Sequence, residues 1–167
     1  MATDNKKVII IPARLAASRL PRKPLAEIAG KPMIQLVWER AIAAKIAPVY
    51  VATDDRDIAN VITSLGGKTV MTRTDHPSGS DRIFEAIETI DPDKNISQVL
   101  NLQGDLPDLS PDIPHLLGVI LDQGNTDLAS LVTPASQYEA SLTQVVKAVV
   151  SWQDEIFGKA IYFSRAV

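Results

Sequence analysis

Four positive charges follow the first apolar run of the sequence, within the stretch "VIIIPARLAASRLPRKPL". Arg14, Arg19, Arg22 and Lys23 fall within ten residues, and no acidic residue intervenes before Glu27. Four cations on one loop can neutralise a triphosphate, which a single lysine cannot do alone. The segment contains no glycine, but its prolines stiffen it because each fixes its own φ. A solvated surface loop is the alternative; its place directly after a predicted strand favours an anion site.

A second polar stretch is "HPSGSDR", His76 to Arg82. Ser78 and Gly79 offer a hydroxyl and an open backbone to a ligand, and Arg82 adds a positive charge. A helix beginning here would present its N-terminus to an anion or a polar ring edge. A turn with a helix cap explains the same residues, and the two interpretations are compatible. His76 alone predicts an ordinary loop histidine.

A third stretch, "NLQGDLPDL", places Gln103, Gly104 and Asp105 just after an apolar run. A carboxylate in this position is well placed to hold Mg²⁺. An aspartate that merely starts the turn before Pro107 is the alternative. Asp54 and Asp55 form a comparable acidic pair, which the N-terminus of a following helix explains.

Strands alternate with helices around these three stretches. Strands are predicted at 8–11, 49–53, 69–72, 98–102, 128–132, 145–150 and 160–163. Segments of helical period begin near Pro32 and Asp57, after either Ser80 or Ser78 as the cap, and after Ser110. This alternation predicts an α/β fold with a doubly wound, mostly parallel, Rossmann-like sheet. All three stretches should then lie at the carboxyl edge of that sheet, where ligands bind. A basic loop, small polar contacts and a carboxylate together indicate Mg-nucleotide chemistry on a phosphate.

Two familiar nucleotide motifs are excluded. No G-x-G-x-x-G follows the first strand, which argues against a dinucleotide fingerprint. The tetrad "GGKT" at 66–69 imitates the end of a Walker A motif, but it precedes a strand rather than a helix. A helix stop and tight turn is the better interpretation.

Length and composition limit the number of domains, the location and the partners that we expect. The chain has 167 residues, a net charge of −3 and no cysteine. We expect one nucleotide-binding α/β domain over 1–167, cytoplasmic, with neither nucleic acid nor membrane as partner. The final "KAIYFSRAV" stops just after a predicted strand, so we expect the N-terminal portion of a longer chain.

Four segments together resemble the 3-deoxy-manno-octulosonate cytidylyltransferase (CMP-Kdo synthetase) family. They are "IIIPARLAASRLPRKPLAEIAGKPMI", "DHPSGSDR", "NLQGDLP" and "AIYFSRA", in this order along nearly the whole chain. The resemblance implies a nucleotidyltransferase that joins CTP and Kdo to give CMP-Kdo and pyrophosphate for lipopolysaccharide biosynthesis. It also implies Mg²⁺ as cofactor and a homodimer in the full-length form.

The resemblance also implies roles for individual residues. Arg14 and Lys23 would bind the triphosphate and stabilise the leaving pyrophosphate, helped by Arg19. The nucleotide would also contact Pro12, Ala13, Ser78, Gly79, Arg82 and Gln103. Asp105 would hold Mg²⁺, and Arg165, with Gln103, would lie at the sugar. Arg22 has no role assigned to it.

Two departures from the family pattern qualify these expectations. Leu106 stands where the family often has an acid, and family members continue well beyond "YFSRA" with a second metal-binding aspartate. A chain complete at Val167 is expected to bind CTP with little turnover. A synthetase for another acidic sugar and a non-catalytic nucleotide-binding module are the alternatives.

Overall fold

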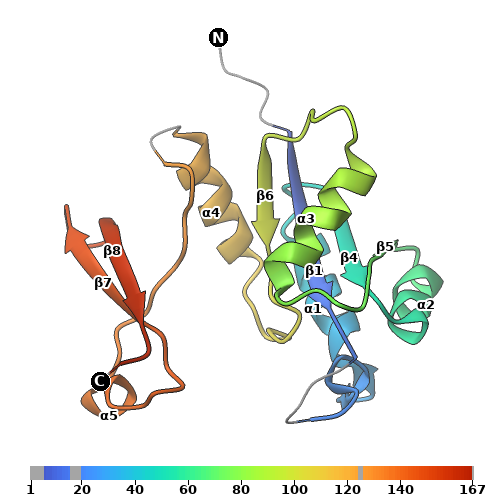
Figure 1. Ribbon diagram of the computed structural model, residues 1–167, viewed down its shortest axis with the longest axis horizontal. Helices are drawn as coiled ribbons and strands as arrows, with labels where there is room; N and C mark the ends of the chain where they lie inside the picture. Colours follow the sequence, from blue (N-terminus) through green and yellow to red (C-terminus); the bar gives the residue numbers. More distant parts are fainter. Residues whose placement is uncertain (1–5, 16–19, 124–125, 167) are drawn as a thin grey trace. The chain divides into compact units, whose positions relative to one another are not determined.

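The computed structural model describes residues 6–15, 20–123 and 126–166 of the chain (Figure 1). The chain divides into two compact units, Met1–Ala129 and Ser130–Val167. Within the described ranges, no helix is both long and apolar enough to cross a lipid bilayer. The sequence had predicted one domain, and each unit is described separately below.

A parallel sheet of four strands forms the centre of the first unit. Its strands lie in the order β5-β4-β1-β6 and have these bounds: Lys68–Met71, Val49–Thr53, Lys7–Ala13 and Gln98–Asn101. Ile9 pairs with Val49 on one side and with Leu100 on the other, which fixes the register of β1. The chain runs outward from β1 to β5 and then crosses back to β6, so the topological switch point lies between β1 and β6. The predicted α/β fold is confirmed.

Side chains of β1 are buried on both faces of the sheet. Ile9 and Ile11 pack against α1 (Met33–Ala43) and α2 (Arg56–Ser64). Val8 and Ile10 point the other way and pack against α3 (Gly79–Ile90). Helices therefore cover both faces, which makes the sheet doubly wound and explains why 8–11 is a continuous apolar run.

The ends of the helices match local sequence signals. Asp55 caps α2 by accepting from the N–H groups of Asp57 and Ile58. The same helix ends at Ser64, and Gly66 follows with a φ of +79°, which favours glycine; the N–H of Gly67 donates to the carbonyl of Ile62. The "GGKT" tetrad is thus a helix stop followed by β5. Ser78 caps α3 by accepting from the N–H of Asp81. The helix α4 (Asp112–Asp122) packs beside β6 through Leu117.

The segment after β1 contains small elements that apolar periodicity did not reveal. A single 3-10 turn, η1, spans Lys23–Leu25. A hairpin follows, with strands β2 (Glu27–Ile28) and β3 (Lys31–Pro32). Its two-residue turn has positive φ at both Ala29 and Gly30, as a type I′ turn requires.

The second unit contains α5 (Gln137–Ala140) and two strands, β7 (Lys147–Trp152) and β8 (Gly158–Ser164). These match the last two predicted strands in place, but they pair antiparallel with each other and do not join the parallel sheet. The strand predicted at 128–132 is wrong, because none of these residues belongs to a strand in the described chain. Leu128 is 79% exposed there, so its apolar run buries little and has no partner strand.

Candidate active site

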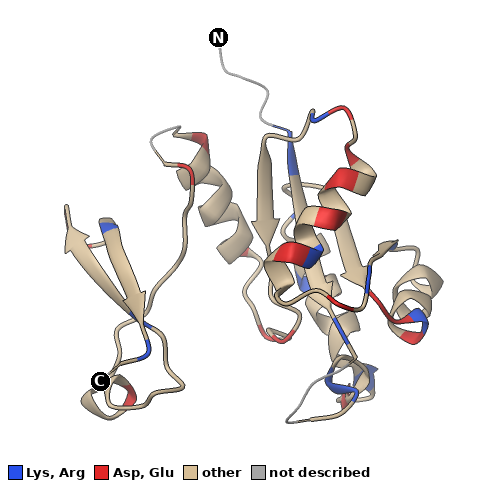
Figure 2. Cartoon of the chain, viewed as in Figure 1, with Lys and Arg blue, Asp and Glu red and all other residues tan. Residues whose placement is uncertain are grey.

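A cleft of about 290 Å³ lies at the carboxyl edge of the parallel sheet. The loops after β1, β5 and β6 line it, beside the switch point where α/β sheets usually bind ligands. Figure 2 shows basic residues gathered after β1 and acidic residues, which the sequence gives as aspartates, on the loop after β6. Residues predicted from the sequence that line the cleft are Pro12, Ala13, Arg14, Lys23, Ser78, Gly79, Arg82, Gln103 and Asp105.

A glycine lets two of the three loops approach each other closely. A Cβ added to Gly104 would lie 2.9 Å from the carbonyl oxygen of Pro12, which is closer than real Cβ contacts. At Gly79 the added Cβ would meet the Pro12 ring at 3.4 Å, an ordinary van der Waals contact, so of these two glycines the close approach requires Gly104 alone. Pro12 is therefore the point on which the other two loops converge.

An ion pair joins the basic loop to the acidic loop. Lys23 Nζ donates to Asp105 Oδ2 at 2.9 Å, across 82 positions of sequence. Both side chains are partly exposed, so the pair contributes only about 0–1 kcal/mol to stability. A phosphate could therefore replace Asp105 as the partner of Lys23 at little cost. The structure brings together the residues predicted for the triphosphate and for the metal.

The other basic residues of the first loop differ in their positions. Arg14 is exposed and lines the cleft. Arg19 lies outside the described residues. Arg22 does not line the cleft; its guanidinium pairs with Asp57 at 2.8 Å, and both side chains are more than half exposed. Its backbone is left-handed, with φ of +57°, at the start of η1. Arg22 thus has an ion-pair partner on α2, which the sequence did not reveal.

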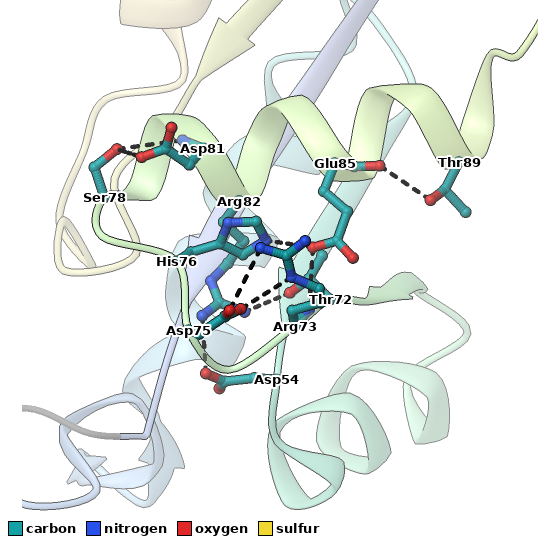
Figure 3. Close-up of polar contacts among 10 residues, drawn as sticks. All are labelled: Asp54, Thr72, Arg73, Asp75, His76, Ser78, Asp81, Arg82, Glu85 and Thr89. Atoms are coloured by element: carbon teal, nitrogen blue, oxygen red, sulfur yellow. Dashed lines mark hydrogen bonds and ion pairs between the residues drawn. The ribbon is translucent and has the colours of Figure 1, made fainter.

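Arg82 is buried at the wall of the cleft (Figure 3). Its side chain is 3% exposed, and one terminal nitrogen donates to Asp54 Oδ2 at 2.8 Å. The other terminal nitrogen donates to the hydroxyl of Thr72. Asp54 and Thr72 follow β4 and β5, so two strand ends hold this guanidinium. The sequence assigned Asp54 to the N-terminus of α2, but Asp55 is the cap and Asp54 pairs with Arg82.

A second polar contact fastens the loop 72–78 to α3. His76 Nε2 contacts Glu85 Oε2, and the same carboxylate accepts from the N–H of Arg73 at 3.0 Å (Figure 3). The hydrogen bond with His76 lowers the pKa of Glu85, although partial burial opposes the shift. His76 therefore lines the cleft as part of a fixed pair rather than as an isolated loop residue.

Four cleft residues were not assigned to the site from the sequence: Pro24, Met33, His76 and Gly104. Gly104 had a signal in the sequence, since it stands between Gln103 and Asp105. The structure adds that a Cβ at this position would lie too close to Pro12. Pro24 and Met33 flank the β2–β3 hairpin, which the sequence analysis missed. Without that hairpin, nothing in the sequence indicates that Met33 returns to the cleft.

Arg165 belongs to the second unit. Its guanidinium donates to the carbonyl of Gln144 at 2.7 Å, and its own carbonyl accepts from Lys147 Nζ at 3.1 Å. These contacts fix the chain after β8 to the segment before β7. A sugar-binding role for Arg165 remains a prediction.

The cleft suits a metal held mainly by a ligand rather than by a protein cage. Asp105 supplies a carboxylate that is about half exposed, and the amide of Gln103 lies nearby in the same loop. Among the described residues, no three acidic or histidine side chains converge as a metal cluster. Mg²⁺ is commonly bound through one or two carboxylates, waters and substrate phosphates, and this donor set fits that mode.

The cytidylyltransferase family model matches residues 8–167 of the chain. The chain belongs to the cytidylyltransferase family. A 3-deoxy-manno-octulosonate cytidylyltransferase of Rhodopseudomonas palustris is 51% identical over 166 residues, covering 98% of this chain and 67% of that protein. One from Paramagnetospirillum magneticum is 45% identical, covering 95% of this chain and 65% of that protein. This cytidylyltransferase is therefore a homologue of 3-deoxy-manno-octulosonate cytidylyltransferases and spans about two thirds of their length.

Solved structures agree with the family and the fold. A CMP:2-keto-3-deoxy-manno-octonic acid synthetase complexed with CTP matches with a TM-score of 0.85 and 43% identity. That match covers 97% of this chain and 65% of the other. A 4-diphosphocytidyl-2C-methyl-D-erythritol synthase from Anaerococcus prevotii matches with a TM-score of 0.60 at 17% identity. It covers 93% of this chain and 63% of the other, and it shows the shared fold alone.

Proposed function

We propose that this cytidylyltransferase activates Kdo with CTP, giving CMP-Kdo and pyrophosphate for lipopolysaccharide biosynthesis in the cytoplasm. The anomeric hydroxyl of the sugar attacks the α-phosphorus of CTP in line. A new bond forms between the sugar oxygen and phosphorus, the bond to the bridging oxygen breaks, and pyrophosphate leaves with its electron pair. The hydroxyl proton passes to solvent. The proposed active form is a homodimer.

The protein's part in this reaction is to position the reactants and to neutralise charge. Lys23 and Arg14 lie where they can bind the triphosphate and stabilise the negative charge that develops on pyrophosphate. Arg19 is proposed for the same role because it lies in the same segment of the sequence. Backbone groups at Pro12 and Ala13, with Ser78, Gly79 and Arg82, form the wall proposed for the nucleoside. Gln103 and Arg165 are the residues proposed for the sugar.

Asp105 is the residue proposed to hold Mg²⁺ against the phosphates. When bound, the ion would offset negative charge on the reacting phosphate and orient it. Asp105 would be free for this role once Lys23 paired with a phosphate instead of the carboxylate. Asp105 would then hold the ion, and Lys23 would bind a phosphate.

One observation carries the proposal. The cleft at the switch point collects the basic loop, the capped N-terminus of α3 and the loop that bears Asp105, on one edge of one sheet. That combination suits a magnesium-nucleotide complex. The homology to 3-deoxy-manno-octulosonate cytidylyltransferases supports the choice of CTP and Kdo.

Release of pyrophosphate tests the proposal directly. The chain is incubated with CTP, Mg²⁺ and either Kdo or a sialate-type sugar, and CTP binding is followed in parallel by calorimetry. Release with Kdo and not with the sialate-type sugar is the expected result, at a low rate for a chain that ends at Val167. Pyrophosphate release only with another acidic sugar would mean that this sugar, and not Kdo, is the acceptor. CTP binding without pyrophosphate release with any sugar would indicate a non-catalytic nucleotide-binding module.

Asp105→Asn tests the metal assignment. Loss of turnover and loss of the Mg²⁺ dependence of CTP binding are expected, because the amide carries no charge. Asp108→Asn is the matched control, since Asp108 is a fully exposed carboxylate in the same loop and does not line the cleft. Near-normal turnover and Mg²⁺ dependence in Asp105→Asn would remove Asp105 from the metal site.

A further inference from the structure

We infer that Asp54 is a positioning residue for the nucleotide, acting through Arg82. The inference rests on the proposed function, because it concerns how the same cleft binds CTP. Asp54 does not itself line the cleft, whereas Arg82 does. Its contribution is to hold the Arg82 guanidinium in one place and in one plane.

The geometry around Arg82 supports this role. Asp54 Oδ2 accepts from one terminal nitrogen at 2.8 Å, while Thr72 accepts from the other (Figure 3). A guanidinium has five N–H donors in a rigid plane, and these contacts use two of them. Among the contacts that the structure describes, the other three donors have no protein partner, and we infer that a ligand in the cleft accepts from them. Because both terminal nitrogens of the guanidinium are held, the direction of its other donors is also fixed.

Burial makes the position of Arg82 depend on Asp54. The side chain of Arg82 is 3% exposed and that of Asp54 is 11% exposed. A buried charge needs a partner of opposite sign, because water does not reach it to compensate. Without the carboxylate, the guanidinium must turn toward water or toward the cleft. In either case its donors no longer meet the ligand in the original direction.

The pair also ties the strand ends to the start of α3. Asp54 follows β4 and Thr72 follows β5, whereas Arg82 lies in the first turn of α3. The same turn begins with Ser78 and Gly79 at the cleft wall. An isolated surface pair would not have this effect. Arg73 and Asp75 form such a pair in the neighbouring loop, with side chains 68% and 70% exposed.

Titration of the 167-residue chain with CTP and Mg²⁺ tests the inference. Asp54→Asn is expected to raise the Kd for CTP about tenfold, as the loss of a hydrogen bond to a charged group implies. Asp75→Asn is the matched control, an aspartate paired with an arginine but exposed, and its Kd should stay within about twofold of wild type. Circular dichroism of each variant at the titration temperature establishes that it is folded.

Two further variants separate positioning from general stability. Thr72→Val keeps the shape of the side chain but removes the acceptor, and it should raise the Kd about threefold. It serves as the test if Asp54→Asn does not fold. Arg82→Lys is then combined with Asp54→Asn in a double-mutant cycle on CTP affinity. If Asp54 acts through Arg82, the aspartate substitution adds less than about twofold in the lysine background.

Each contrary outcome is distinct. A Kd within twofold of wild type in folded Asp54→Asn, or in Thr72→Val if Asp54→Asn does not fold, would overturn the inference and leave the proposed function intact. Fully additive effects with Arg82→Lys would show that Asp54 does not act through that residue. Failure of the wild-type chain to bind CTP would remove the proposed function and this inference with it.

Discussion

The two units of the chain differ in how their side chains are held. In the described part of the first unit, twenty Ala, Val, Ile, Leu and Met side chains are buried, and polar residues pair across long stretches of sequence, as Lys23 does with Asp105. In the second unit, no described residue is buried, and its largest contact is one antiparallel strand pair. A hairpin alone is marginally stable in water. The core and polar pairs of the first unit can therefore hold a binding site in a fixed geometry, whereas the described part of the second unit has no such core.

This difference affects the two proposed substrates unequally. Every described residue proposed for the nucleotide lies in the first unit, on loops anchored to a buried sheet. Of the two residues proposed for the sugar, Gln103 lies in the first unit, beside the residues proposed for the nucleotide, and Arg165 lies in the second. Substitutions in the first unit should change CTP binding, whereas those in the second should leave it unchanged. The following predictions test that division.

The largest effect is expected from Gly104→Ala. The new Cβ would lie 2.9 Å from the Pro12 carbonyl oxygen, so one of the two loops must move. Overpacking of this kind costs about 1–3 kcal/mol of stability. CTP affinity should also fall markedly, because the moved loop carries Asp105 or the backbone of Pro12. Thermal denaturation and CTP titration measure the two effects.

Gly118→Ala is the matched control for this change. Gly118 lies within α4, where an added Cβ meets only ordinary contacts from 3.8 Å. Alanine in a helix interior is more favourable than glycine by about 0.5–1 kcal/mol. The control should therefore raise the Tm without changing CTP affinity. If Gly104→Ala behaved like this control, the close approach to Pro12 would not constrain the cleft.

Lys23→Ala should weaken CTP binding about tenfold, because it removes a charge-assisted contact with the triphosphate. The KM for sugar should change less. Calorimetry with CTP and with CMP measures the effect, and only the triphosphate should respond strongly. Arg22→Ala removes the neighbouring charge, which faces Asp57 and not the cleft, and it should change the Kd by less than twofold. Equal effects of Lys23→Ala and Arg22→Ala would mean that the basic loop attracts anions through its overall charge and not through a specific contact of Lys23.

Asp91→Asn should affect the stability of the first unit and leave its chemistry unchanged. The N–H groups of Ile96 and Asn95 lower the pKa of Asp91 by bonding to its carboxylate. A lowered pKa stabilises the folded protein above the unfolded value of about 3.9, and this stabilisation is lost as the pH falls through the folded value. The Tm difference between wild type and variant should therefore be full at pH 7 and shrink below about pH 4. A difference that does not vary with pH would mean that the carboxylate charge is not what the N–H groups stabilise.

The smallest effect on the nucleotide is expected from Arg165→Ala, in the second unit. CTP affinity should stay within about twofold of wild type, since its described contacts are with Gln144 and Lys147. If Arg165 binds the sugar, the KM for Kdo should rise, whereas Lys159→Ala on the same hairpin should change neither. A large loss of CTP affinity in Arg165→Ala would mean that the division between the two units does not hold for the ligands.

The parallel sheet could be predicted because its local signals agree with its packing. The apolar run of β1 reflects burial on both faces, and Ser78 and Asp55 are standard caps for the helices that follow them. Leu128 and its neighbours carry the same apolar signal without a partner, so the strand predicted there was wrong. Apolar character alone does not tell whether a segment finds a partner strand.

The cleft could be predicted for a topological reason, and its internal pairing could not. Residues that follow parallel strands gather at one edge, so most of the lining was expected from strand order alone. The pairs Asp54–Arg82 and His76–Glu85 depend on how loops fold back on α3, and spacing carries little information about that. The short β2–β3 hairpin was missed because two-residue strands have no measurable period.

The position of β1 has a consequence for how the protein moves. It is hydrogen-bonded to strands on both sides and covered on both faces, with Ile9, Ile10 and Ile11 wholly inaccessible. Amides in such a strand exchange with solvent hydrogen only when the whole unit opens. In deuterium, the amides of 9–11 should therefore be among the last to exchange. The loop proposed to bind the triphosphate therefore begins directly after a strand whose amides are expected to exchange among the slowest in the protein.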